Sequence, residues 1–163
     1  MNERKRRILV GVDGSDDARR ALHWAIDHAR ELRAEIVAVH AVELPPYLLA
    51  GSGAPATTAA DQEWREDIKN RFQTAFDQEW RESIKNRFQD QWLRPLKDSG
   101  VPYRVVVGDG DPAAVLTQAA EGQDVDMIVL GRRGLGGFPD LLLGSVSEKV
   151  THHSRRPVVL LSP

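Results

Sequence analysis

The fold is decided by RILVGVDGSDDARRALHWAIDHARELRAEIVAVHAV, residues 7–42. This stretch begins and ends with short apolar runs rich in β-branched residues, RILVGV (7–12) and EIVAVHAV (35–42), as expected of strands that helices cover on both faces. Between the runs, Ser15 is a suitable N-cap, and apolar residues then recur every three or four positions from Ala18 to Leu32. The stretch therefore predicts a strand, an amphipathic helix and a second strand.

The rest of the chain repeats this alternation. Three further apolar runs are YRVVVGD (103–109), DMIVLG (126–131) and PVVLL (157–161). One helix is predicted to begin at Pro112, and a short last helix to begin at Ser145 or Ser147 and to run through Val150. Alternating strands and helices predict a parallel sheet with right-handed crossovers. We therefore expect one α/β domain over residues 1–163, a doubly wound five-stranded parallel sheet with helices on both faces.

The composition of the 163 residues excludes several classes of protein. Lys and Arg number 22 and Asp and Glu 24, a balance that gives no reason to expect nucleic acid or a membrane as a partner. The lack of cysteine excludes a disulfide scaffold, Cys-ligated zinc and thiol chemistry, and it agrees with a reducing cytoplasm. No run approaches the roughly 18 apolar residues of a membrane span. The start, MNERKRR, is similar to that of a signal peptide, but Gly11 and Asp13 break the apolar run that follows, so we expect a cytoplasmic protein.

The most informative loop is GRRGLGGFPDLLLGSVS, residues 131–147, which leads from the fourth predicted strand into the last helix. In an open parallel sheet, ligands bind outside the carboxyl ends of the strands, where this loop lies. Glycines let backbone N–H groups approach a ligand and permit left-handed conformations that hold anions, and a helix start favours a phosphate. Composition alone leaves a tight turn as an equal alternative.

The spacing within that loop separates these alternatives. Gly131, two residues, Gly134, nine residues and then Gly144 with Ser145 form a pattern that occurs here together with VGVDGS (10–15) and with LLLGSVSEKV (141–150). The combination resembles the universal stress protein family, in the subgroup that binds ATP, from Ile8 to Leu161. The resemblance implies a sheet of strand order 3-2-1-4-5, bound ATP and a homodimer formed through the last strands.

The resemblance also implies a role for each matching position. It makes Asp13 the acidic contact to adenosine, Ala41 the backbone contact to adenine and Gly131 the ribose contact. The phosphate cradle falls on Gly134, Gly144, Ser145 and Val146. Arg132 and Arg133 lie where the family varies, so their assignment to ATP rests on charge and position alone. A turn residue at Asp13 and solvated loop cations at the two arginines are the alternatives.

The predicted function is that of a cytoplasmic regulatory or stress-response protein that binds ATP, alone or with Mg²⁺. No lysine follows Gly144 as a Walker-type loop requires, and we find no connected set of nucleophile, base and orienting residue, so we expect no catalytic residues. His40 is expected to be a hydrogen-bonded core residue. The alternatives are a slow ATPase or nucleotidyl-transfer enzyme on the same fold, and a scaffold that binds no ligand.

A tandem duplication interrupts the family pattern. The phrases TAADQEWREDIKNRFQ (58–73) and TAFDQEWRESIKNRFQ (74–89) follow each other within the predicted second helix. Their apolar residues recur every four positions, but sixteen residues rotate a straight helix by about 160°, so the two copies would present Trp, Ile and Phe to nearly opposite sides. We expect a long helix whose extra face meets a second copy of the chain, a break near Thr74 and Ala75, or a disordered bulge.

Deletion of residues 74–89 is expected to leave ATP binding intact and to change assembly, because the predicted nucleotide contacts lie elsewhere in the chain. Calorimetric titration with ATP and light scattering measure the two effects separately. Loss of ATP binding in the deletion variant would show that the repeat packs at the nucleotide site.

Overall fold

The predicted sheet is present in the computed structural model, which describes residues 5–42, 79, 82–135 and 142–162. Five parallel strands are arranged in the order β3-β2-β1-β4-β5, which confirms the expected class and strand order. The strands are β1 (Arg7–Gly11), β2 (Glu35–Val42), β3 (Tyr103–Asp109), β4 (Met127–Gly131) and β5 (Val158–Leu161). Each lies within one or two residues of the apolar run that predicts it.

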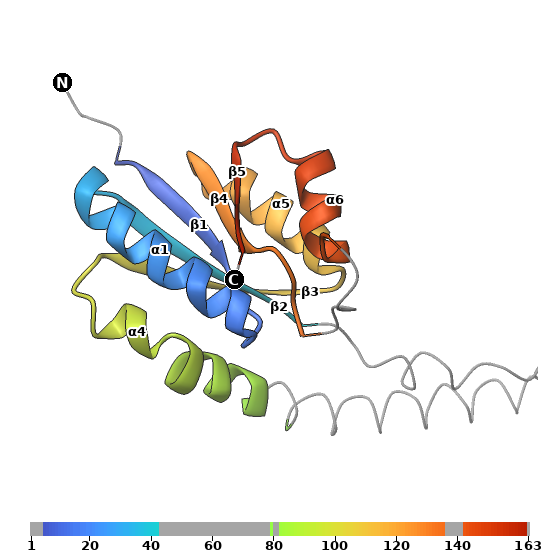
Figure 1. Cartoon of the computed structure of the whole chain (residues 1–163). Helices are drawn as coiled ribbons and strands as arrows, with labels where there is room; N and C mark the ends of the chain where they lie inside the picture. The colour runs from blue at the N-terminus through green and yellow to red at the C-terminus, as the bar shows by residue number, and fades with distance from the viewer. Residues whose placement is uncertain (1–4, 43–78, 80–81, 136–141, 163) are drawn as a thin grey trace, which may run out of the picture.

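Helices cover both faces of this sheet (Figure 1). They are α1 (Asp16–Leu32), the π-helical turn η2 (Phe88–Trp92), α4 (Arg94–Lys97), α5 (Pro112–Gly122) and α6 (Ser145–His153). Strand residues alternate between two cores: Ile8 and Val10 pack with α1 and α4, and Leu9 packs with α5. The apolar runs are therefore continuous because both faces of each central strand are buried.

The helix starts follow the capping chemistry of the sequence. Ser15 Oγ accepts a hydrogen bond from the Ala18 backbone N–H at 3.1 Å, as predicted. The last helix begins at Ser145, which decides between the two predicted starts, and it continues to His153, three residues beyond the predicted Val150. No helix among the described residues has the length and hydropathy needed to cross a bilayer.

The second copy of the duplicated phrase reaches the core at its end. Residues 82–87 are α-helical, and Phe88, which follows them, is fully buried in the core beside Leu93 and Leu96. The Leu93 N–H then donates to the Phe88 carbonyl at 3.0 Å, a π-type bond across five residues. The first copy and the junction at Thr74 and Ala75 lie outside the described residues, so the three expectations for the course of this helix stay predictions.

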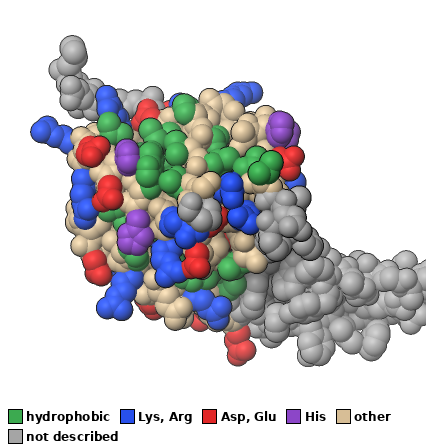
Figure 2. Space-filling model, viewed as in Figure 1, with side chains coloured by type: hydrophobic (Ala, Val, Ile, Leu, Met, Phe, Trp, Pro, Cys, Tyr) green, Lys and Arg blue, Asp and Glu red, His purple; other side chains and the backbone are tan. Residues whose placement is uncertain are grey.

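Acidic and basic side chains are interspersed on the face shown in Figure 2, in keeping with their near balance in the sequence. Among the described residues, two carboxylates are buried, those of Asp17 and Glu35. The Glu35 carboxylate, at the start of β2, accepts hydrogen bonds from Arg7 Nε of β1 at 3.3 Å and from Arg104 Nε of β3 at 3.0 Å. Burial raises the pKa of Glu35, but the hydrogen bond and charge of Arg104, with Arg7 and Lys5, outweigh burial and lower that pKa below its ordinary value of 4.5.

Replacement of Glu35 by Gln is expected to lower the free energy of unfolding by about 1–2 kcal/mol at neutral pH, because two charged donors lose their carboxylate. Since the folded-state pKa lies below the unfolded value, this contribution is present above pH 4.5 and is lost as the pH falls through the folded-state pKa. Urea unfolding at neutral and acidic pH should therefore show that the difference in the free energy of unfolding between wild type and variant decreases as the pH falls. A difference in the free energy of unfolding that does not change with pH would contradict this account. Glu121→Gln is the control, because Glu121 forms an exposed ion pair with Arg155.

Candidate functional site

Two loops meet at the carboxyl ends of the neighbouring strands β1 and β4. Asp13, just after β1, accepts the Ser15 N–H on Oδ1 at 2.9 Å, which fixes its own turn. Its Oδ2 accepts the Leu135 N–H at 3.3 Å from the loop after β4. The structure therefore brings Asp13 to the glycine-rich loop, and the carboxylate is both a turn residue and a link between the loops.

The loop after β4 depends on close approach at its glycines. A Cβ at Gly131 would lie 2.5 Å from the Asp17 carbonyl carbon, and a Cβ at Gly134 would lie 2.6 Å from Asp13 Oδ2. At Gly144 the nearest atom to a Cβ would be Arg133 Cα, at 3.3 Å. None of these three glycines has a positive φ. The expectation of left-handed backbone is therefore wrong for Gly131 and Gly134, where the lack of a side chain provides room for neighbouring atoms.

The amino end of α6 closes the site. Gly144 precedes the helix with extended backbone, and its N–H donates to the Arg132 carbonyl at 2.9 Å, which ties the helix start to the loop. The N-cap residue is a glycine, so it brings no side chain to cap this helix end. The first N–H groups of a helix, here those of Ser145 and Val146, have no partner within the helix and favour an anion. The structure thus brings the predicted cradle residues Gly134, Gly144, Ser145 and Val146 to one place.

The two arginines of the loop differ in their surroundings. The backbone of Arg132 donates to the Leu161 carbonyl of β5 at 2.8 Å, and its side-chain Nε is buried without a hydrogen-bond partner among the described residues. A guanidinium remains charged, so a buried donor on it is satisfied best by an anion. The backbone N–H of Arg133 instead donates to Asp17 Oδ2 at 3.1 Å. The loop therefore has the donor chemistry that a phosphate-bearing ligand requires.

Ala41 lies at the same edge of the sheet, one residue before the end of β2, the strand beside β1. It is half-buried and packs beside the core that α5 and α6 cover. Gly136 and Gly137 lie outside the described residues, so their expected part in the loop stays a prediction.

An aromatic cluster packs against the loop that carries Asp13. His40 of β2 is buried, as predicted, and its Nδ1 lies 2.7 Å from the Val12 carbonyl, which can only accept, so Nδ1 donates. The ring centroids of Phe88 and Trp92 lie 5.3 and 5.2 Å, respectively, from the ring centroid of His40. Burial lowers the pKa of His40, and this outweighs the opposite effects of the Val12 carbonyl and the Asp13 charge. The imidazole is therefore held neutral.

Trp92 also touches the loop itself. Gly14 has φ +86°, and a Cβ there would lie 2.4 Å from the Trp92 indole. The sequence shows Trp92 only as the next apolar residue, four positions after Phe88, and gives no sign that it would reach residue 14. The sequence indicates Ser147 only as a possible helix start, whereas its buried Oγ donates to the Gly131 carbonyl at 2.8 Å.

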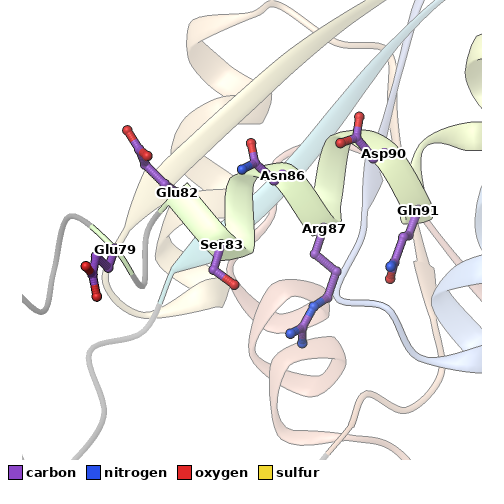
Figure 3. A pocket seen from close by; sticks show the side chains of 7 residues that line it. All are labelled: Glu79, Glu82, Ser83, Asn86, Arg87, Asp90 and Gln91. Carbon is purple, nitrogen blue, oxygen red and sulfur yellow. The ribbon is translucent and has the colours of Figure 1, made fainter.

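A shallow hollow is lined by side chains of the helical segment that ends the duplicated phrase (Figure 3). Its lining consists of Glu79, Glu82, Ser83, Asn86, Arg87, Asp90 and Gln91. All of these side chains come from one helical segment, so the hollow is a solvated polar face rather than an enclosed site. Among the described residues, no three His, Cys, Asp or Glu side chains are grouped to hold a metal ion.

Comparison with known proteins gives a consistent result. The model of the universal stress protein family matches residues 5–162. A universal stress protein of Thermus aquaticus is 34% identical over 156 residues, which are 94% of this chain and 96% of that protein. The universal stress protein YxiE of Bacillus subtilis is 27% identical over 95% of this chain and 97% of its own length.

Solved structures share the fold. The universal stress protein UspA of Lactobacillus plantarum superimposes with a TM-score of 0.64 at 23% identity, over 99% of this chain and all of that one. A universal stress protein in complex with cAMP has a TM-score of 0.56 at 22% identity, covering 96% of both chains. The Archaeoglobus fulgidus protein in complex with dAMP has a TM-score of 0.56 at 18% identity, covering 98% of both.

Trp92→Ala is expected to raise the pKa of His40 toward its ordinary value of 6.5, because removal of the indole lets water reach the imidazole. The His40 titration followed by NMR checks this. Trp24→Ala is the control, since Trp24 stacks on His28 of α1, 3.6 Å between ring centroids, and should leave His40 unchanged. An unchanged His40 titration in the Trp92 variant would show that the indole does not seal this cluster.

Proposed function

We propose that this chain, which belongs to the universal stress protein family, binds ATP and acts as a nucleotide-dependent regulatory module. The observation that carries the proposal is the meeting of Asp13 with the backbone of Gly134 and Leu135, opposite the uncapped amino end of α6. The cAMP and dAMP complexes of universal stress proteins of the same fold support an adenine nucleotide as the ligand class.

Different residues of the site would bind different parts of the ATP molecule. The N–H groups at Gly134, Gly144, Ser145 and Val146 would hold the phosphates with the α6 dipole. Gly131 would contact the ribose, the Ala41 backbone would meet the adenine edge, and Asp13 would accept a hydrogen bond from the adenosine. Arg132, whose buried Nε lacks an acceptor among the described residues, adds positive charge for a polyphosphate, and Arg133 adds a second cation. ATP would bind alone or with Mg²⁺.

A regulatory role follows from what Asp13 already binds. Its Oδ2 accepts the Leu135 N–H, so a nucleotide that engages this oxygen would compete with the bond. Competition would release the loop at Leu135, whose side chain is 74% exposed, and would change the surface offered to a partner. An ATPase or nucleotidyl-transfer enzyme would instead turn over ATP many times and would lose this turnover in Asp13→Ala.

We propose further that the protein is a homodimer in the cytoplasm. Within the described sheet, β5 is an end strand that pairs with β4 alone, and its four residues are half-buried. An apolar end strand is protected from aggregation when a second copy pairs with it. A second helix lengthened by the duplication, if formed as predicted, would offer a second contact between copies, and the lack of cysteine suits a reducing compartment.

Gly134→Val is expected to weaken ATP binding by at least about tenfold, because its side chain would occupy the space beside Asp13 Oδ2 and displace the loop N–H groups. Calorimetry and the rise in melting temperature with added ATP measure the effect. Gly122→Ala, at a glycine whose Cβ would meet nothing within 4 Å, is the matched control and should bind as the wild type does. Unchanged affinity in a folded Gly134→Val protein would refute the assignment.

A further inference from the structure

Two neighbouring aspartates at the start of α1 have different surroundings. Asp16 and Asp17 each pair with an arginine three residues later, Arg19 and Arg20. The Asp16 side chain is 73% exposed, whereas the Asp17 side chain is 10% exposed. Both serve the positive end of the helix dipole equally well. The burial of Asp17 therefore needs a second reason.

That reason is a contact with the loop after β4. Asp17 Oδ2 accepts the backbone N–H of Arg133 at 3.1 Å, across 116 positions of the chain. The end of β4 lies directly against the same turn of α1, because a Cβ at Gly131 would be 2.5 Å from the Asp17 carbonyl carbon and 2.7 Å from the Ala18 nitrogen. The first turn of α1 is thus a platform on which the glycine-rich loop rests.

Two carboxylates, one from this platform and one from the loop before it, hold the glycine-rich loop on both sides of one glycine. Asp17 binds the N–H of Arg133, and Asp13 binds the N–H of Leu135. Gly134 lies between them, and its nitrogen is 3.6 Å from where a Cβ of Gly144 would be, at the amino end of α6. The distance between the Gly134 amide and α6 therefore depends on both carboxylates. Asp13 is half-buried, whereas Asp17 is buried.

We infer that Asp17 is a positioning residue of the nucleotide site: it fixes Arg133, and through it Gly134, at the spacing from α6 that a bound phosphate needs. This inference rests on the proposed function. Asp17 does not touch the ligand, so its removal should act on affinity through the loop backbone. Removal of Asp16 should likewise remove one negative charge and one ion pair with an arginine from the start of α1, but it should leave the glycine-rich loop unaffected.

The two aspartates supply a matched pair of variants. Asp17→Ala should weaken ATP binding about tenfold in calorimetry, because a charge-assisted hydrogen bond to the loop is lost. Asp16→Ala should stay within about twofold of the wild type, as expected of an exposed ion pair. Asp17→Asn keeps an oxygen that can accept the Arg133 N–H, so it should recover affinity to within about threefold of the wild type. Equal affinities of Asp17→Ala and Asp16→Ala would overturn the inference.

Hydrogen exchange of the Arg133 amide in nucleotide-free protein tests the contact without any ligand. It should be faster in Asp17→Ala than in the wild type and unchanged in Asp16→Ala. Faster exchange with unchanged ATP affinity would also overturn the inference, because the contact would then not serve the site. If Asp17→Ala does not fold, Asp17→Glu, whose carboxylate is one methylene farther out, should bind more weakly than Asp17→Asn, and the reverse order would count against the inference.

The two proposals fail differently. If the wild-type protein does not bind ATP, the proposed function is wrong, and the exchange of the Arg133 amide alone decides whether Asp17 holds the loop.

Discussion

The end of β4 lies directly on the first turn of α1, and this contact is possible because residue 131 has no side chain. From this contact the rest of the site follows. It brings the loop after β4 within hydrogen-bonding distance of Asp13 and Asp17, and the Gly144 N–H, bonded to the Arg132 carbonyl, places the start of α6 beside the same loop. A Cβ at position 131 would separate these elements, and the backbone N–H groups would no longer converge on one point.

The strand order and the candidate site residues followed from the family resemblance, whereas the strands and the helix starts could be predicted from the residue pattern itself. Local periodicity and caps carry this information, as the buried runs and the Ser15 cap show. The contacts that depend on distant parts of the chain were not predictable. Asp17 appears in the sequence only as a first-turn acid, and nothing in its neighbourhood reveals a bond to Arg133. Left-handed backbone was expected at Gly131 and Gly134, whereas the lack of a side chain there allows close approach between elements that are distant in the sequence.

The duplicated phrase bears on the site more closely than its sequence suggests. Its last residues run into Phe88 and then Trp92, which packs beside His40 and beneath Gly14. Through Phe88 and Trp92, the end of the repeat and the residues that follow it therefore pack against His40 and the turn that carries Asp13. A chain with one copy would offer Phe72 in the place of Phe88, since the two phrases end alike, so the support does not depend on having both copies.

The central claim is that a nucleotide binds where Asp13, the loop after β4 and the start of α6 converge. Backbone amide NMR spectra recorded during an ATP titration test it most directly. We predict that the largest shifts fall on residues 13–15, 131–135 and 144–146, with small changes at the opposite edge of the sheet near Glu35. Shifts concentrated elsewhere, or a spectrum that ATP leaves unchanged, would contradict the account.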